Sequence, residues 1–533
     1  MDERIYPENE WQAEPVPMKP VRDYSAAECV FAWLCLLAGY LFCRAFPVWT
    51  NPLGGFVVIL LLFIAATVVL LRRGSKPGWG AVLAALSAVA ISASLILITN
   101  SFLRFLAYTY ALAVFCYYVY AATGNSLQKG FSDFIAIDFL KALFVMPFYS
   151  LSHVFKAMFT GKGKRSGKLI GKVLVGVALA VVPTLIVAAL LSYDKGFADL
   201  LEKLLRFDAF DLLSHLFSIL FGIPVGMYLY GLYISSADGK CRSAMTVEKC
   251  QNTAGQMKIV PAITAVTAVI PLLFLYVVFF LSQWSYYVSG FTGVLPQNFS
   301  YAEYAREGFF QLCIVSVINL LVLAAVIAFM RRGSRGTTAL FKSIAVCFSL
   351  FTLVLIATAI AKLVMYIDFY GLTPKRVYAA WFMGLLTVIF LLIIVKQFAG
   401  KLPVVAAAIV AFAIMFAGLT LPNTDGFIAK YNMNRYMSGS LETVDVEAME
   451  DLGLAAVPQM VQLMDVLEEQ EDTGPLYQDT QWFLYRIHCR YFVDDAPLFA
   501  WSVPYSQAKA AMARLDMEAM TEALFPSTEE YRD

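Results

Sequence analysis

The chain has 533 residues, of which 60% are hydrophobic and only 15% are charged. A soluble protein is roughly 45–50% apolar and about 25% charged, so these proportions exclude a soluble enzyme, a disordered protein and a secreted disulfide scaffold. The near balance of 40 basic and 39 acidic residues excludes a generally basic nucleic-acid-binding protein. The composition therefore predicts an integral membrane protein.

Long apolar stretches recur along most of the chain. A helix needs about 20 apolar residues to cross a hydrocarbon core about 30 Å thick, and about 11 stretches meet this criterion. They are 26–42, 53–71, 79–99, 102–122, 169–192, 212–235, 259–282, 308–330, 338–366, 377–395 and 402–421. Because each stretch is continuous and does not alternate in polarity, helices are favoured over the strands of a membrane barrel. The predicted fold class is all-α, a polytopic transmembrane helical bundle.

Basic residues follow the even-numbered stretches. Lys and Arg close to span ends are held on the cytoplasmic side of a membrane, so the amino terminus is expected inside and, with an odd number of spans, the carboxyl terminus outside. The basic residues that carry this prediction are Arg72, Arg73 and Lys76; Lys129 to Lys168; Lys240, Arg242, Lys249 and Lys258; and Arg331, Arg332 and Arg335. Residues 134–148 also predict one or two helices lying on the inner surface.

Three regions are expected. Residues 1–25 are polar and contain four prolines, which predicts a disordered cytoplasmic lead. Residues 26–421 form the transmembrane bundle, and residues 422–533 form a small helical extracytoplasmic region. This tail carries 20 acidic and 7 basic residues. Helices are expected from Pro458, through 482–491, and over 506–525 with Ser506 as the cap; a solvated acidic decoration is the competing interpretation.

Prolines lie near the middle of three successive predicted spans. They are Pro183, Pro224 and Pro271, and the glycines around the second are Gly222, Gly226 and Gly231. Transporters use interrupted helices to expose backbone groups to a substrate. Kinks and small residues also let neighbouring helices pack closely, and this is the favoured interpretation.

No cofactor or metal is expected. The nine cysteines are scattered without metal-site or redox-motif spacing, and the three histidines lie far apart. The segment 161–168 resembles a phosphate-binding loop, but five residues separate its outer glycines and Leu169 follows its last lysine. It is interpreted as a basic inner loop that meets anionic lipid. An enzyme is therefore the less favoured class.

The densest polar chemistry lies between the seventh and eighth predicted spans. Ser300 and Glu303 fit a capping box, and Glu303, Arg306 and Glu307 share one helix face. Ionisable residues at a membrane usually face a cavity or one another and mark function; a cap and ion-pair network that only fixes the loop is the alternative. The candidate outer-face site is Tyr301, Glu303, Tyr304, Arg306 and Glu307, completed by Lys362, His215 and Arg104 if their helices are neighbours.

The segment 300–312, continuing into 318–320, resembles an uncharacterised family of bacterial multi-pass membrane proteins, a domain of unknown function of the 4153 or 4173 type. A weaker likeness covers 429–436 and 455–458. The resemblance implies a bacterial origin and a plasma-membrane location, and it supplies no activity.

Three functions from different classes stay open. The first is a transporter of a small polar or lipid-linked solute, and the second is an outer-face membrane enzyme acting on a lipid or envelope precursor. The third is a membrane scaffold or sensor acting through its acidic tail. The expected partners are the lipid bilayer and an envelope protein or lipid-linked ligand, with no nucleic acid. The sequence predicts an envelope-associated, multi-pass protein of the bacterial plasma membrane whose activity is unknown.

Overall fold

The computed structural model describes residues 24, 26–45, 51–128, 130–159, single positions between 176 and 197, and then 209–239, 246–282, 309–331, 334–471, 473–493 and 497–525. These residues form helices, and a bridge between Val260 and Met330 is the sole β-type pairing that they contain. The predicted disordered lead, residues 1–25, lies almost entirely outside the described residues.

Eight described helices are long and apolar enough to cross a membrane. They are α2 (Pro52–Arg72), α3 (Trp79–Ala93) with η1 (Ser94–Ile96), α4 (Ser101–Ala122), α9 (Ala209–Ala237), α11 (Ala262–Ser282), α14 (Phe309–Phe329), α15 (Arg335–Tyr370) and α16 (Pro374–Phe398). A ninth crossing results if α17 (Val404–Thr420) and α18 (Thr424–Met437), which meet at 55°, are counted as one. The prediction of an all-α protein with several membrane spans is confirmed.

The count of about 11 spans and the orientation stay predictions. α1 (Ala26–Ala45) is a further helix of 20 residues at the first predicted span. The fifth predicted span, 169–192, lies largely outside the part of the chain that the structure describes.

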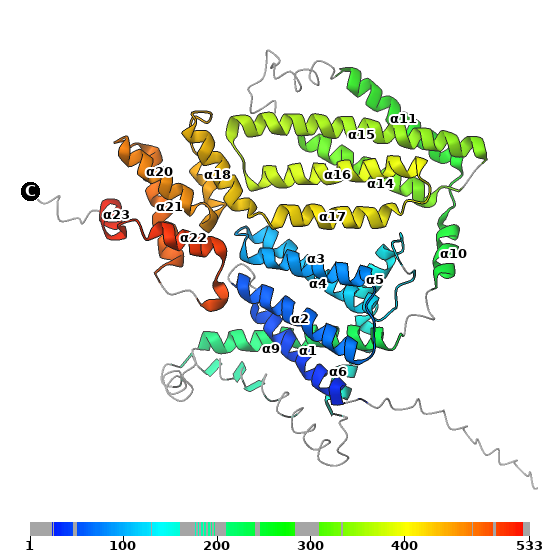
Figure 1. Ribbon diagram of the computed structural model, residues 1–533, viewed down its shortest axis with the longest axis horizontal. Helices are drawn as coiled ribbons and strands as arrows, with labels where there is room; N and C mark the ends of the chain where they lie inside the picture. The colour runs from blue at the N-terminus through cyan, green and yellow to red at the C-terminus, as the bar shows by residue number, and fades with distance from the viewer. Residues whose placement is uncertain are drawn as a thin grey trace, which may run out of the picture.

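The long helices lie side by side in two groups (Figure 1). The first group, α1 to α4 with α9, shares one buried core, and the second, α11 with α14 to α16, shares another. α17 contacts both. Its Phe416 packs on Tyr110 of α4 with ring centroids 5.7 Å apart, and its Met415 carbonyl accepts a hydrogen bond from the Trp381 indole of α16 at 2.8 Å. One helix therefore joins the two groups.

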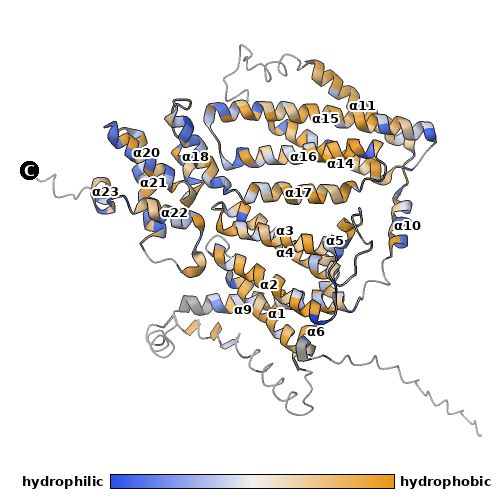
Figure 2. Ribbon diagram, viewed as in Figure 1, coloured by the Kyte–Doolittle hydropathy of each residue, from blue (hydrophilic) through white to orange (hydrophobic). Residues whose placement is uncertain are grey.

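The outer surface of these helices is apolar (Figure 2). Leu61, Phe274 and Leu321, for example, expose 53%, 68% and 63% of their surface. Leaving apolar surface in water costs roughly 25 cal/mol per Å², so a continuous belt of such side chains requires lipid around it. The chain is a membrane-embedded protein.

α1 and α9 cross at glycines, which explains why glycines surround Pro224. A Cβ atom added at Gly39 would lie 2.1 Å from the carbonyl oxygen of Gly222, and one added at Gly231 would lie 2.3 Å from that of Pro147. Backbones this close leave no room for any side chain. Pro224 itself lies inside the continuous helix α9. These contacts favour packing, rather than an interrupted substrate-binding helix, as the role of the glycines.

A short helix at one end of the first group turns its apolar side outward. α5 (Ile135–Phe144) is followed by η2 (Pro147–Ser150) and α6 (His153–Phe159). Leu140 and Phe144 are exposed, whereas Asp138 is buried and accepts hydrogen bonds from the Tyr120 hydroxyl and the Leu127 amide, both at 3.0 Å. Burial raises the pKa of the Asp138 carboxyl. The exposed apolar face suits a helix that rests on a membrane surface.

The C-terminal helices gather at one end of the long helices (Figure 1). After α18 they are α19 (Val446–Glu450), η3 (Gly453–Ala455), α20 (Val457–Glu469), α21 (Pro475–Tyr491), η4 (Leu498–Ala500), α22 (Val503–Met512) and α23 (Met517–Leu524). They have their own core, in which Met460, Leu463 and Phe483 are almost fully buried.

The prediction of one helix over 506–525 with Ser506 as its cap is wrong, because the first helix begins earlier, at Ser502, and a second cap, Asp516, divides the segment. The Ser502 hydroxyl accepts a hydrogen bond from the Tyr505 amide at 3.3 Å and begins α22. The Asp516 carboxylate accepts hydrogen bonds from the Glu518 and Ala519 amides, both at 3.1 Å, and begins α23. A side chain that binds the first free amides of a helix starts a new helix there.

We expect Gly39→Ala to lower the stability of the folded protein by about 1–3 kcal/mol, the usual cost of overpacking, because the new methyl group meets the Gly222 backbone. Thermal unfolding in detergent measures this effect. The matched control is Gly418→Ala, since a Cβ atom at Gly418 of α17 meets nothing within 4 Å. Equal unfolding temperatures for the two variants would contradict the close crossing.

Candidate functional site

The core of the predicted outer-face site lies outside the described residues. Tyr301, Glu303, Tyr304, Arg306 and Glu307 all belong to the segment 283–308, so their cluster stays a prediction. Asn319, deeper in the same predicted span, is described and fully buried. It accepts a hydrogen bond from Tyr276 at 2.5 Å and donates one to Thr352 at 2.9 Å, so it links α14 to α11 and α15.

The three other residues of the predicted site have different surroundings. His215 of α9 stacks on Tyr40 of α1, and its Nδ1 lies 2.7 Å from the Tyr40 hydroxyl. Lys362 lies in α15, which packs in the second group of helices. Arg104 of α4 is buried, and its Nε donates to the Ile98 carbonyl at 2.6 Å. Of these three residues, Arg104 belongs to a larger polar site.

That site is centred on the buried carboxylate of Asp425, in the first turn of α18. Its Oδ2 accepts hydrogen bonds from the Thr99 amide at 2.8 Å, the Thr99 hydroxyl at 2.7 Å and the Asn100 amide at 2.8 Å. The Thr99 hydroxyl also contacts the Leu452 carbonyl at 2.9 Å. The positive charge of Arg104 interacts with the same carboxylate. Asp425 thus fixes the C-terminal helices to the loop before α4.

A second set of contacts fixes α18 to the turn between α15 and α16. The side chain of Asn432 accepts from the Leu372 amide at 2.7 Å and donates to the Leu372 carbonyl at 2.8 Å. Gly371 has φ of +77°, and a Cβ atom there would lie 2.6 Å from the Asn432 oxygen. This position therefore requires glycine, both for its backbone conformation and for its contact with Asn432.

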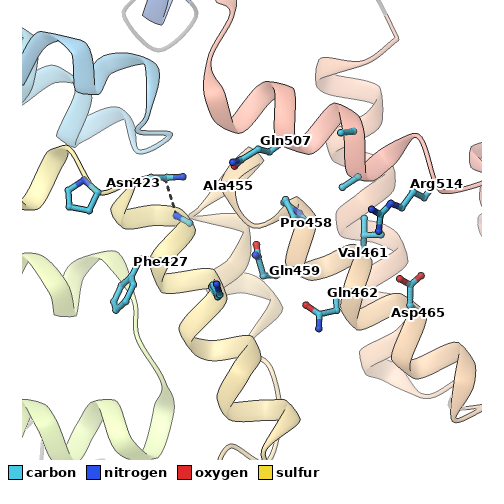
Figure 3. Close-up of a pocket in the computed structure, with 15 residues that line it drawn as sticks. Asn423, Phe427, Ala455, Pro458, Gln459, Val461, Gln462, Asp465, Gln507 and Arg514 are labelled. Atoms are coloured by element: carbon cyan, nitrogen blue, oxygen red, sulfur yellow. Dashed lines mark hydrogen bonds between the residues drawn. The ribbon is translucent and has the colours of Figure 1, made fainter.

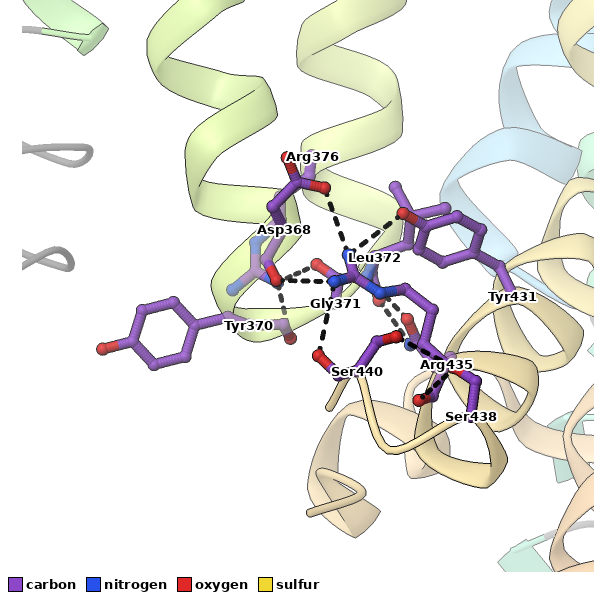
Figure 4. A network of polar contacts seen from close by, with 10 residues as sticks. Asp368, Tyr370, Gly371, Leu372, Arg376, Tyr431, Arg435, Ser438 and Ser440 are labelled. Atoms are coloured by element: carbon purple, nitrogen blue, oxygen red, sulfur yellow. Dashed lines mark hydrogen bonds and ion pairs between the residues drawn. The ribbon is translucent and has the colours of Figure 1, made fainter. Parts of the chain in front are cut away.

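Arg435 strengthens the same contact (Figure 4). Its guanidinium pairs with the Asp368 carboxylate at 3.1 Å and donates to the Asp368 carbonyl at 2.9 Å. It also reaches the Tyr431 hydroxyl at 3.3 Å. α18 is therefore attached to the first group of helices through Asp425 and to the second through Asn432 and Arg435.

Next to this attachment is a groove of about 770 Å³ between α18, α20 and α22 (Figure 3). Lys430 comes from α18, Gln462 and Asp465 from α20, and Gln507 from α22, while Arg514 lies just after the end of α22. Pro422 and Asn423, which lie between α17 and α18, also line it. The groove therefore begins where the last apolar helix ends.

The chemistry of the groove suits a polar ligand. The lining includes three glutamines, whose amides both donate and accept hydrogen bonds. Two cations, Lys430 and Arg514, face one carboxylate, Asp465, although the tail as a whole is strongly acidic. Phe427 adds an aromatic ring that is 58% exposed. Amides, a surplus of positive charge and an exposed ring fit a hydroxylated, anionic ligand.

Asp425 and most of the groove were not predicted from the sequence. A lone aspartate after an apolar helix looks like an ordinary helix-start residue, and its partners lie more than 320 positions earlier. A signal for α18 was present, because the weaker family likeness over 429–436 contains Asn432 and Arg435. Among the described residues, no group of three or more His, Cys, Asp or Glu side chains is placed to hold a metal ion.

The comparisons with known proteins identify a family and no characterised relative. The model of DUF4153, a domain of unknown function, matches residues 58–463, which is more than half of the chain. This range includes all of α18 and most of α20. No curated protein and no solved structure matches the chain.

Asp425→Ala should lower the free energy of unfolding by about 3–5 kcal/mol, because it leaves the Thr99 and Asn100 donors and the Arg104 charge without their buried partner. Hydrogen exchange at the Thr99 and Asn100 amides should become faster as well. Asp451→Ala, at an exposed position in the same set of helices, serves as the control. Unchanged exchange at both amides in Asp425→Ala would show that the carboxylate does not hold this loop.

Proposed function

Since this chain belongs to the DUF4153 family, we propose that it is an envelope-associated, multi-pass protein of the bacterial plasma membrane that acts as a receptor or scaffold. In this proposal its C-terminal helices, residues 422–533, face the outside and bind a polar, anionic, lipid-linked ligand of the envelope in the groove between α18, α20 and α22. The observation that carries the proposal is the groove itself, which opens at the membrane end of helices attached to both halves of the bundle.

The distribution of charge supports the outward orientation. The bridge from Val260 to Met330 brings the start of α11 and the end of α14 to one side, together with the basic residues Lys258, Arg331 and Arg335. α10 (Val247–Met257) lies at that side, and the acidic C-terminal helices lie at the opposite one (Figure 1). Because positive residues are retained in the cytoplasm, the C-terminal helices are outside and the amino terminus is inside.

The position of the groove supports a lipid-linked ligand. Pro422 and Asn423 follow the last residues of α17, so one end of the groove lies at the membrane boundary. Lys430 and Arg514 provide positive charge for phosphate or carboxylate groups, and the glutamines hydrogen-bond to hydroxyl groups. A ligand anchored in the membrane by its lipid would present its head group at the membrane boundary, where this end of the groove lies.

The attachment of α18 supports a receptor or scaffold. Asp425, Asn432 and Arg435 fix the groove to both groups of long helices, and rigid elements hold a binding site more accurately than loops. Transport receives less support, because the glycines around Pro224 are used for packing. The polar segment 301–307 remains a second proposed site, since α11 ends and α14 begins on the side of the C-terminal helices.

The orientation predicts which cysteines a membrane-impermeant maleimide reaches in intact spheroplasts. Cys489 is exposed in α21, on the outer side of the proposal, and Cys250 lies in α10 on the inner side. Cys489 should react before permeabilisation and Cys250 only after it, with Cys489→Ser and Cys250→Ser variants to assign each signal. The reverse order would place the C-terminal helices in the cytoplasm and overturn the proposal.

The groove is tested by filling it. Ala510 lines the groove on α22, whereas the exposed Ala513 at the end of the same helix does not. In a deletion strain under envelope stress, we expect Ala510→Trp to lose rescue at normal membrane abundance, because the indole occupies the space of the ligand. Ala513→Trp should rescue like the wild type. Full rescue by Ala510→Trp, with loss by Glu303→Gln or Glu307→Gln, would move the function to the segment 301–307.

A further inference from the structure

A second recess lies at the opposite end of the molecule from the groove. It has a volume of about 470 Å³ and is lined by Gln251, Ala254 and Gly255 of α10, by Lys258, and by Arg331. The lining contains two cations, one amide and no carboxylate. Neither Lys258 nor Arg331 forms a side-chain hydrogen bond or ion pair with a described residue. Among the described residues, neither positive charge of the recess therefore has an ion-pair partner.

Backbone hydrogen bonds fix the segments that carry the two cations. The Val260 amide donates to the Phe329 carbonyl at 3.0 Å, and the Arg331 amide donates to the Val260 carbonyl at 2.8 Å. Lys258 lies two residues before this bridge, and Arg331 is part of it. The two cations, 73 positions apart in sequence, are thus brought to the same recess by the bridge. This arrangement is more ordered than a basic loop.

The recess lies at the boundary of the apolar helices. α11 begins at Ala262 and α14 ends at Phe329, so both apolar helices end directly beside the two cations. Ile259, which follows Lys258 in the chain, and Ile263, in the first turn of α11, expose 69% and 67% of their surface. α10, in contrast, is polar and contains no buried residue. The cations of the recess are thus followed in the chain, within five residues of Lys258, by exposed aliphatic side chains.

We propose that this recess binds the phosphate group of an anionic phospholipid. The phosphate would accept hydrogen bonds from Lys258, Arg331 and Gln251, and the acyl chains would cover Ile259 and Ile263. Basic pockets beside membrane helices bind anionic head groups in this way, and Arg supplies two parallel donors to a phosphate. The exposed isoleucines favour a lipid over free phosphate, because only a lipid covers them.

Native mass spectrometry of the purified full chain in neutral detergent tests the site. The probes are phosphatidylglycerol, phosphatidylcholine and soluble glycerol phosphate. We expect phosphatidylglycerol to bind more tightly than phosphatidylcholine, and the double variant Lys258→Gln/Arg331→Gln to bind phosphatidylglycerol about 25-fold more weakly. The exchanged variant Lys258→Arg/Arg331→Lys keeps both charges and should keep most of the affinity. Its binding shows that the segment still folds when both residues are replaced.

The matched control is Arg72→Gln/Lys76→Gln, which removes two exposed cations, at the end of α2 and just after it, that do not line the recess. This control should bind phosphatidylglycerol like the wild type. Competition by glycerol phosphate at the concentration of the lipid would keep the phosphate site but identify the ligand as soluble. The proposal would be overturned if Arg72→Gln/Lys76→Gln lost as much affinity for phosphatidylglycerol as Lys258→Gln/Arg331→Gln. It would also be overturned if Lys258→Gln/Arg331→Gln lost no affinity.

Discussion

The arrangement of the C-terminal helices depends on one buried carboxylate. Asp425 has no exposed surface, and one of its oxygens accepts three hydrogen bonds from Thr99 and Asn100. A charge is stable away from water only when donors or opposite charges surround it. Both α4 and α18 begin at this point, and the amino-terminal ends of helices favour negative charge. The carboxylate therefore permits one relative position of the two helix starts.

This constraint explains why the groove has a defined place. α18 forms one of its walls, and the same helix carries Asp425, Asn432 and Arg435 on its attached side. The groove is consequently tied to the loop before α4 and to the turn before α16, which belong to different groups of long helices. A change in how these two groups pack would move the groove. By the same coupling, a ligand bound in the groove would change how the two groups pack.

The remainder of the bundle obeys a different rule, because its surroundings are lipid. Apolar side chains cover its outside, so contacts between helices are stabilised by close van der Waals packing and not by the exclusion of water. The crossing of α1 and α9 at Gly39 and Gly222 shows this directly. Polar contacts such as those of Asn319 also link the long helices, but the two polar recesses lie at the ends, one beside α10 and one beside α18. The two proposed ligand sites lie at these ends, where lipid head groups are also found.

The local sequence was sufficient to predict the helical class and most of the long helices. Continuous apolar stretches such as 377–395 have no alternative to a helix in lipid, and α16 covers that stretch. Helix limits that depend on caps were predicted less well, because Ser502, not Ser506, caps α22 and Asp516 begins a separate helix, α23. The predicted polar cluster at 301–307 lies outside the described residues and stays a prediction.

The sequence by itself determined which segments lie in lipid and which lie in water, since hydropathy is a local property of consecutive residues. What only the tertiary structure decided is which distant residues meet. Nothing local distinguishes Asp425 from other aspartates at helix starts, and its importance arises because Thr99 and Asn100 are brought to it by folding. Lys258 and Arg331 likewise line the same recess only because the bridge between Val260 and Met330 brings their segments together. Both proposed binding sites depend on such long-range contacts, because a single membrane helix presents too few polar groups to form a site.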